Sequence, residues 1–232
     1  MNTKRLGLQK LTLLDYPGLL ACTVFFNGCN FRCPFCHNSA LVEPGNEKTL
    51  AENEAIMDFL KKRSSILDGV CFTGGEALLH EEIQEYAKYA KSLGYKVKID
   101  TNGSFPDRLA ALLDSGSVDY VAMDIKNSPE KYAVTCGNAH ILPQVERSVE
   151  LLLSGKITCE FRTTATGNLH EVSDFTAIGK WICGAQRYFI QSFVPSEDIL
   201  EKNTDFTVTD FQLAEFLAAV KPYIPNAALR GK

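Results

Sequence analysis

The chain of 232 residues carries three closely spaced cysteines that could hold a metal centre together. Cys29, Cys33 and Cys36 follow a C-x3-C-x2-C pattern within segment 28–38, GCNFRCPFCHN. Thiolates are soft ligands that suit zinc or an iron–sulfur cluster, and three at this spacing can converge from one loop. Three thiolates on a four-iron cluster leave one iron without a protein ligand, and an open coordination position is where a metal centre binds substrate. The spacing therefore indicates a centre that carries out chemistry.

Two plainer alternatives stay open on the residues alone. A structural zinc needs four ligands, and His37 could be the fourth, although ligands adjacent in the chain are strained and no second cysteine pair lies nearby. An ordinary four-cysteine cluster could take its last ligand from one of the five remaining cysteines. We expect those five to be small buried apolar residues, as free cysteines commonly are. They are Cys22, Cys71, Cys136, Cys159 and Cys183.

Composition excludes several classes of protein. Hydrophobic residues make up 45% of the chain and charged residues 22%, which is typical of folded globular domains. The net charge of −4 gives no sign of nucleic acid or an anionic membrane as a partner. The longest apolar run, 19–26, is far shorter than the ~20 residues of a spanning helix. Asp15, Tyr16 and Pro17 interrupt any signal sequence, so we expect a cytoplasmic protein in a reducing compartment.

Strand-like and helix-like segments alternate along the chain. Strands are expected at 20–26, 70–73, 96–100, 120–125, 157–163 and 188–194. Helices are expected from Thr49, from Leu79, from Pro106, from Pro143, over 172–181, and from Thr209, whose capping box includes Gln212. This alternation predicts one α/β domain over 1–232 with a parallel sheet, either doubly wound or a complete or partial barrel. Residues 1–18 are expected to add an N-terminal strand or hairpin.

Polar residues gather where these strands end, at the edge where parallel α/β folds build their sites. Gly74, Gly75 and Glu76 end the second strand, and the segments 100–103 (DTNG) and 124–126 (DIK) end the third and fourth. Arg162 and Gln191 lie near the ends of the fifth and sixth. Each has a plain alternative, because Gly and Asn-Gly make ordinary turns and charges at strand ends are commonly solvated.

The cysteine triplet after the first strand, with Gly-Gly-Glu after the second, resembles the radical S-adenosylmethionine (radical SAM) superfamily. The resemblance implies a partial (βα)6 TIM-like barrel and one [4Fe–4S] cluster on Cys29, Cys33 and Cys36. The open iron would chelate S-adenosylmethionine, and one electron would cleave it to methionine and a 5′-deoxyadenosyl radical that abstracts a hydrogen atom. No catalytic side chain is implied beyond the cluster and this cofactor.

The same resemblance implies a set of cofactor-binding residues. The backbone of Gly74, Gly75 and Glu76 would hold the methionine amino group, although Ala77 departs from the proline that often follows. Lys126 would place a charge near the cofactor's carboxylate or the entering peptide, and Arg162 would meet a carboxylate or the ribose. The other expected contacts come from Phe35, His37, Asp100, Asn102, Asp124 and Gln191. His37 could instead touch a partner or orient its loop, and Phe35 could shield the cluster. Asp100, Thr101 and Asp124 would bind a monovalent cation beside the methionine carboxylate.

Within the superfamily, the chain resembles the glycyl-radical-enzyme activases, and among them the activating proteins of anaerobic ribonucleoside-triphosphate reductase. Segment 7–18 (GLQKLTLLDYPG) and the Cys-Pro-Phe-Cys-His-Asn run carry that likeness. It implies a glycyl radical enzyme as protein substrate and a flavodoxin or ferredoxin as electron donor. Two alternatives remain. One is a radical enzyme for a small molecule, similar to 7-carboxy-7-deazaguanine synthase. The other is a zinc or electron-transfer protein without S-adenosylmethionine chemistry.

Overall fold

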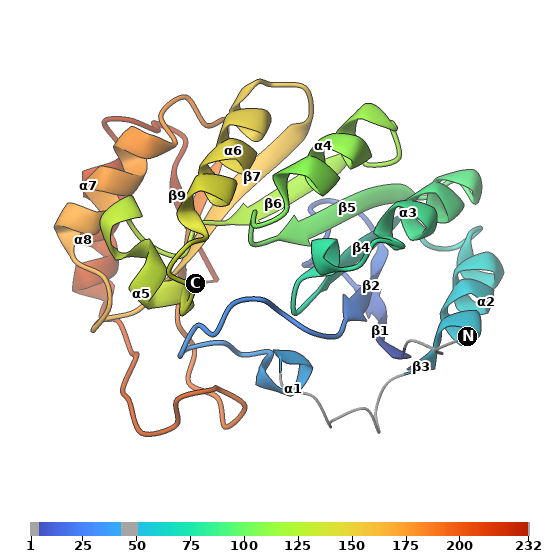
Figure 1. Cartoon of the computed structure of the whole chain (residues 1–232), viewed down its shortest axis with the longest axis horizontal. Coiled ribbons are helices and arrows are strands. Elements are labelled where there is room, and N and C mark those ends of the chain that lie inside the picture. Colours follow the sequence, from blue (N-terminus) through green and yellow to red (C-terminus); the bar gives the residue numbers. More distant parts are fainter. Residues whose placement is uncertain (1–4, 43–50, 232) are drawn as a thin grey trace. The chain divides into compact units, whose positions relative to one another are not determined.

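The computed structural model describes residues 5–42 and 51–231, along which strands alternate with helices (Figure 1). Contacts between Cα atoms divide the chain into two compact units. Unit 1 takes its residues from Met1–Asn30, Ala40–Thr101 and Asp107–Val121. Unit 2 takes its residues from Phe31–Ser39, Asn102–Pro106 and Ala122–Lys232. That the chain acts as one domain stays a prediction.

Unit 1 is built on a sheet whose strands run in the order β3-β1-β2-β4-β5. These are β1 (Arg5–Thr12), β2 (Ala21–Phe26), β3 (Ala51–Glu52), β4 (Gly69–Gly74) and β5 (Lys96–Thr101). The strands β2, β4 and β5 are parallel, whereas β1 pairs antiparallel with β2 and β3. The first three expected strands are therefore confirmed within one or two residues, because short β-rich apolar runs are a strong local signal.

The helices of unit 1 follow its parallel strands in the chain. They are α2 (Asn53–Arg63), the short 3₁₀ helix η2 (Ala77–Leu79), α3 (Ile83–Ser92) and α4 (Pro106–Asp114). Two expected starts are corrected. The first expected helix is α2, which begins at Asn53, and its expected start at Thr49 lies outside the described residues. Leu79 belongs to η2 and not to α3, because His80 adopts an extended backbone that separates the two helices.

The faces of the unit 1 sheet carry different side chains. On one face, Phe26 and Phe72 pack with Tyr86 of α3, and the Phe26 and Tyr86 rings meet edge to face with centroids 5.4 Å apart. On the other face, the register places Cys71 of β4 beside Lys98 of β5. Because alternate residues of a strand face opposite sides, Lys98 and Asp100 share this second face.

The chain passes from unit 1 to unit 2 within β6 (Tyr120–Asp124). Its strands β7 (Thr158–Ala165), β8 (Tyr188–Ser192) and β9 (Ala228–Arg230) are neighbours and parallel. Its helical elements are η3 (Pro129–Lys131), α5 (Tyr132–Cys136), α6 (Leu142–Leu153), α7 (Val172–Trp181) and α8 (Asp210–Val220). The four-residue helix α1 (Ser39–Val42) begins directly after the cysteine segment.

Local sequence signals place most of unit 2 correctly. Helix α7 has the expected bounds, and Thr209 caps α8 by accepting from the Gln212 amide. The expectation missed α1, β3, α5 and β9, which are too short to show a hydrophobic period. The ring of Phe175 stacks on that of Phe216 at 4.3 Å and joins α7 to α8.

None of the eight cysteines, all of which lie in the described ranges, forms a disulfide. Cys22, Cys71, Cys136 and Cys159 are buried, as expected for small apolar residues. Cys183 is exposed, so that expectation was wrong for this residue. It lies in the turn after α7, outside the strands and helix faces that form the core. Within the described ranges, no helix is long and apolar enough to cross a membrane.

Candidate active site

In unit 1, the Gly-Gly-Glu turn that ends β4 is bonded to the chain that leads into Cys29. The Gly75 amide donates to the Phe26 carbonyl at 2.9 Å, and the Glu76 amide donates to the Gly28 carbonyl at 2.9 Å. Both acceptors lie in the segment from the end of β2 to Cys29. The turn therefore fixes the backbone from which the first proposed cluster ligand extends.

Both glycines of this turn are required because a side chain at either position would collide with neighbouring backbone. Gly74 has φ 128°, and a Cβ there would lie 2.2 Å from the Phe26 carbonyl oxygen. A Cβ on Gly75 would lie 2.1 Å from the Gly28 carbonyl oxygen and 3.2 Å from Cβ of Cys29. The expected reason for the glycines was close approach to a ligand. In the structure they allow close approach to the cysteine segment itself, and contact with the methionine amino group stays a prediction.

The third residue of the turn, Glu76, is a buried link between the ends of β4 and β5. Its Oε1 accepts from the Leu78 amide at 2.9 Å and from Oγ1 of Thr101 at 2.8 Å. A buried carboxylate is tolerated when donors of this kind satisfy it. Thr101, expected as a cation ligand, thus donates its hydroxyl proton to Glu76.

Asp100 lies at the same end of β5 and is paired with a lysine. Its carboxylate accepts from the ammonium of Lys98, whose side chain is 1% exposed, while that of Asp100 is 13% exposed. The Lys98 ammonium also lies 3.6 Å from Sγ of Cys71. The Lys98 ammonium therefore already neutralises the carboxylate at which the resemblance implies a monovalent cation. The residues of unit 1 do not fit a bound monovalent cation at Asp100.

The rest of the cysteine segment belongs to unit 2, which holds it by backbone hydrogen bonds. The Arg32 amide donates to the Cys136 carbonyl at 2.8 Å, and the Glu201 amide donates to the Pro34 carbonyl at 2.9 Å. Within the segment, the Cys36 amide donates to the Cys33 carbonyl at 3.1 Å. The loop that carries these two cysteines is thus fixed from two sides without using their thiols.

The two ring side chains of this loop act as anchors. Phe35 is buried, and its ring packs edgewise on those of His170 and Phe206. His37 stacks on Phe193 with ring centroids 5.0 Å apart, and its Nε2 is 2.6 Å from the Val194 carbonyl oxygen. Of the roles left open for His37, the structure shows the orientation of its loop. Contacts of Phe35 or His37 with a cofactor stay predictions.

Asp124, Lys126 and Arg162 come together at the ends of β6 and β7. Oδ1 of Asp124 is 2.9 Å from Nε of Arg162, and Oδ2 is 2.9 Å from Nζ of Lys126. Burial acts to raise the pKa of Asp124, but the charges of Arg162 and Lys126 hold it well below the usual range. Burial acts to lower the pKa of Lys126, but the charges of Asp124 and then Cys33 raise it. This trio therefore carries a net positive charge in unit 2. Its Lys126 lies close enough to Cys33 for the two side chains to interact electrostatically.

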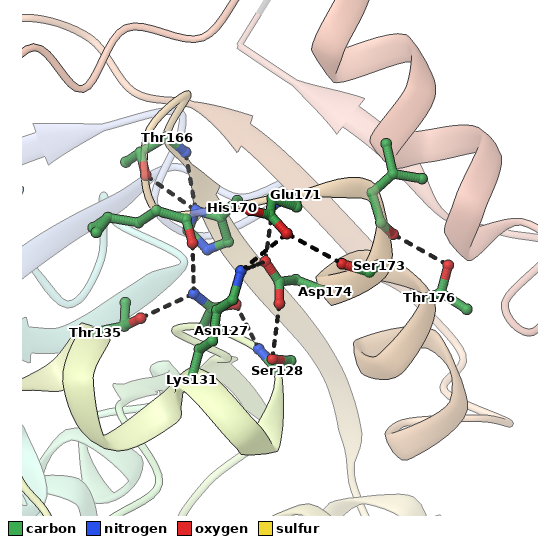
Figure 2. A network of polar contacts seen from close by, with 12 residues as sticks. Asn127, Ser128, Lys131, Thr135, Thr166, His170, Glu171, Ser173, Asp174 and Thr176 are labelled. Carbon is green, nitrogen blue, oxygen red and sulfur yellow. Dashed lines mark hydrogen bonds and ion pairs between the residues drawn. The ribbon is translucent and has the colours of Figure 1, made fainter.

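Figure 2 shows a polar network that includes Asn127, His170 and Asp174. Through His170, this network holds the backbone that carries Lys126. The His170 ring is buried, with Nδ1 accepting from the Thr166 amide at 3.2 Å and Nε2 lying 3.0 Å from the Lys126 carbonyl oxygen. An Nδ1 that accepts leaves the proton on Nε2, so His170 donates to that carbonyl. Nδ2 of the Asn127 side chain donates to the Leu169 carbonyl at 3.0 Å.

The network continues from Asn127 toward α7. Asp174 accepts from Oγ of Ser128 at 3.0 Å, from Nζ of Lys131 at 2.8 Å and from the Glu171 amide at 2.8 Å. These bonds tie the segment after β6 to the start of α7, as Figure 2 shows. The backbone at Lys126 is thus held by bonds that do not involve the side chains of the trio.

Two further expected residues lie in unit 2. Asn102 is buried, and its Oδ1 accepts from the Ser104 amide at 2.9 Å, which closes the turn after β5. Gln191 pairs with Thr164 in the register of β7 and β8, so it shares a sheet face with Arg162. That Gln191 contacts the cofactor stays a prediction.

Sequence reasoning missed Lys98 and His170. A lysine two residues before an aspartate on one strand is a usable signal, because the two must share a face. A lone histidine after β7 carries no such signal, since only the folded chain brings it to Lys126.

The donor set suits an iron–sulfur cluster, because Cys29, Cys33 and Cys36 form no disulfide and lie on segments held by backbone bonds. Among the described residues, no group of three or more His, Cys, Asp and Glu side chains stands ready to hold a metal ion. The convergence of the three thiols on one centre therefore stays a prediction.

Comparison with known proteins decides the family. The model of the radical SAM superfamily matches residues 23–174, which is more than half of the chain. The chain belongs to the radical SAM superfamily. The expected α/β architecture is confirmed as a parallel sheet of the radical SAM type, and membership implies a [4Fe–4S] cluster and S-adenosylmethionine as cofactors.

Similar proteins include curated relatives and solved radical SAM structures. A Methanocaldococcus jannaschii protein, provisionally named a glycyl-radical enzyme activating enzyme, is 31% identical over 97% of this chain and 94% of its own. The 7-carboxy-7-deazaguanine synthase of Thermoplasma acidophilum is 34% identical over 53% of this chain and 54% of its own. Streptococcus suis SuiB bound to S-adenosylmethionine superposes with a TM-score of 0.70 at 13% identity. That match covers 88% of this chain but 47% of SuiB, so it concerns the fold alone.

Proposed function

We propose that this radical SAM enzyme is a glycyl-radical-enzyme activase whose protein substrate is the anaerobic ribonucleoside-triphosphate reductase. The observation that carries the activase assignment is the similarity, over 97% of the chain, to the Methanocaldococcus jannaschii protein provisionally named an activating enzyme. The choice of reductase rests on segment 7–18 and the Cys-Pro-Phe-Cys-His-Asn run. A flavodoxin or ferredoxin would supply the electron.

When bound, the cluster would use one external electron to cleave S-adenosylmethionine, which would supply methionine and a 5′-deoxyadenosyl radical. Transfer of a hydrogen atom from the Cα of one glycine of the partner would leave 5′-deoxyadenosine and a glycyl radical on that partner. No proton has to be moved by a side chain in this step. Because no side chain has to transfer a proton, the site needs groups that position the cofactor and the partner, and it does not need an acid–base pair.

The residues of this chain would bind and orient. Cys29, Cys33 and Cys36 would hold the cluster, and the turn 74–76 would present its backbone to the methionine amino group. Lys126 and Arg162 would offer positive charge to the methionine carboxylate or the ribose hydroxyls, with Asp124 fixing both side chains. The bonds from His170 and Asn127 to the neighbouring backbone would keep Lys126 in place.

A radical enzyme for a small molecule is the second candidate. The similarity to 7-carboxy-7-deazaguanine synthase favours it at 34% identity, but over 53% of the chain. The activating enzyme matches almost the whole chain, including the segment before β2 that carries the likeness to activases. We therefore place the activase first.

Electron paramagnetic resonance of a reconstituted pair tests this proposal. The anaerobic enzyme, S-adenosylmethionine and a reductant are mixed with purified anaerobic ribonucleoside-triphosphate reductase, and in parallel with pyruvate formate-lyase. A glycyl radical signal on the reductase supports the proposal, and the Cys33→Ser enzyme should give none. A signal on pyruvate formate-lyase alone would refute the choice of partner. Abundant 5′-deoxyadenosine without a radical on either protein would favour the small-molecule enzyme.

A further inference from the structure

A fully buried lysine lies beside the strand-end aspartate of β5. The Lys98 side chain is 1% exposed and Asp100 is 13% exposed, and the ammonium is paired with Oδ1 of Asp100. The pairing follows from the sequence, because residues two apart on one strand point to the same face. Lys96, two residues earlier on that face, is 60% exposed and lies 3.2 Å from Asp119 instead.

A lysine is almost never buried in this way without a specific partner, because taking an ammonium out of water is costly. Here the Asp100 carboxylate compensates it, and Sγ of Cys71 lies 3.6 Å away. The sequence thus places a fixed positive charge beside one carboxylate, although burying an apolar side chain at position 98 would cost less free energy. This desolvation cost indicates that the charge has a function.

We propose that Lys98 permanently supplies the positive charge that a bound monovalent cation would otherwise supply at Asp100. This inference rests on the proposed binding of S-adenosylmethionine at the ends of the strands. A carboxylate close to the anionic end of that cofactor repels it unless a cation stands between them. The ammonium of Lys98 would reduce this repulsion, because it is a positive charge that is covalently attached to the protein and cannot dissociate from it.

The other residues expected to bind a cation fit the same account. The Asp124 carboxylate is held by the charged groups of Arg162 and Lys126, each at 2.9 Å. The Thr101 hydroxyl donates to Glu76 at 2.8 Å. In both units, therefore, side chains of the protein take the place of an external ion.

The first test measures binding of S-adenosylmethionine to the reconstituted wild-type enzyme by calorimetry. Titrations are run in potassium chloride and in tetramethylammonium chloride at equal ionic strength, because the organic cation is too large for a potassium site. The affinities should agree within about twofold, since no exchangeable cation takes part. Affinity about tenfold or more weaker without potassium would overturn the proposal.

The second test removes the built-in charge. In Lys98→Met, binding in tetramethylammonium should weaken by about tenfold or more, and potassium should restore much of it. Lys96→Met, which removes an exposed lysine of the same strand face, is the matched control and should behave like the wild type. A Lys98→Met enzyme that binds equally well in both salts, with wild-type affinity, would contradict the role of Lys98.

Thermal unfolding of the same samples gives a readout that does not need the cofactor. Potassium should raise the unfolding temperature of Lys98→Met by about 2 °C or more over tetramethylammonium, and leave the wild type unchanged. If wild-type enzyme bound no S-adenosylmethionine in either salt, the cofactor assignment would fail, while the unfolding temperatures would still decide the role of Lys98. If Lys98→Met did not fold, the wild-type titrations alone would decide it.

Discussion

At the scale of single residues, each aspartate of the candidate site is paired with cationic side chains of the same protein. Asp100 is matched by Lys98, and Asp124 by Lys126 and Arg162. The thiols are the exception, because their role requires a metal from outside the chain. The three cysteine ligands could be predicted from their spacing, and the Lys98–Asp100 pair could have been, because the two residues lie two apart on one strand. The pair of Asp124 with Arg162 joins two strands and could not be predicted.

Cys33→Ser tests the ligand assignment directly. We expect a folded protein whose anaerobic reconstitution yields almost no iron, against about four iron atoms per chain in the wild type. The reason is that a serine hydroxyl is a poor replacement for a soft thiolate. Iron and sulfide analysis with visible absorption spectroscopy measures the result.

Cys183→Ser is the matched control for that variant, because Cys183 is an exposed thiol far from the cysteine segment in sequence. It should retain the wild-type iron content. Full cluster loading in Cys33→Ser, or equal loss in both variants, would contradict the assignment of Cys33 as a ligand.

At the scale of elements, two packed segments position the site. In unit 1, the turn after β4 is bonded to the chain between β2 and Cys29. In unit 2, the segment after β6 is bonded to the stretch between β7 and α7. The strands and long helices could be predicted from hydrophobic patterns, with boundaries shifted by a few residues. The bonds between loops could not, because they join residues far apart in sequence and have no periodic signature.

Gly75→Ala should disturb the cluster through the turn after β4. The added methyl group would lie 2.1 Å from the Gly28 carbonyl oxygen and 3.2 Å from Cβ of Cys29, so that backbone has to move. We expect weaker thermal stability together with clearly reduced iron incorporation, measured by differential scanning calorimetry and iron analysis.

Gly116→Ala separates this effect from ordinary glycine strain. Gly116 has φ 65° but open space around its Cβ position, so alanine there costs about 1–2 kcal/mol of backbone strain without touching the cysteine segment. It should lower stability and leave iron content at the wild-type level. Normal iron incorporation in Gly75→Ala would contradict the proposed coupling of the turn to Cys29.

His170→Gln tests the network that holds Lys126 through its dependence on pH. Burial lowers the pKa of His170, and this effect exceeds the opposing influence of its hydrogen bonds and of Asp174. As the pH falls below about 6.5, the unfolded chain binds a proton that the folded histidine does not, so stability is lost. The slope contributed by this one group is at most about 1.4 kcal/mol per pH unit.

We therefore expect His170→Gln to be less stable than the wild type at pH 8 but to lose less stability between pH 7 and pH 5. Urea unfolding at each pH measures both effects. His140→Gln shows what the loss of an exposed histidine does and serves as the comparison. Equal slopes for wild type and His170→Gln would contradict the buried neutral state of His170.

At the scale of the whole molecule, the alternation of strands and helices and the chemistry of two short motifs lead to the same family. The superfamily match over residues 23–174 covers the cysteine triplet, the turn after β4 and the trio in unit 2. The class of fold and of enzyme could therefore be predicted from the sequence. The protein partner could not, because the residues that would recognise it form no motif with a chemistry of its own.

The most direct test of the account is whether the protein cleaves S-adenosylmethionine reductively. The chain is reconstituted with iron and sulfide without oxygen, reduced with dithionite and given S-adenosylmethionine, and the products are separated by liquid chromatography. We predict 5′-deoxyadenosine and methionine in equal amounts, and neither from Cys33→Ser. A protein that holds zinc, or that loads iron and leaves S-adenosylmethionine intact, would contradict the central claim.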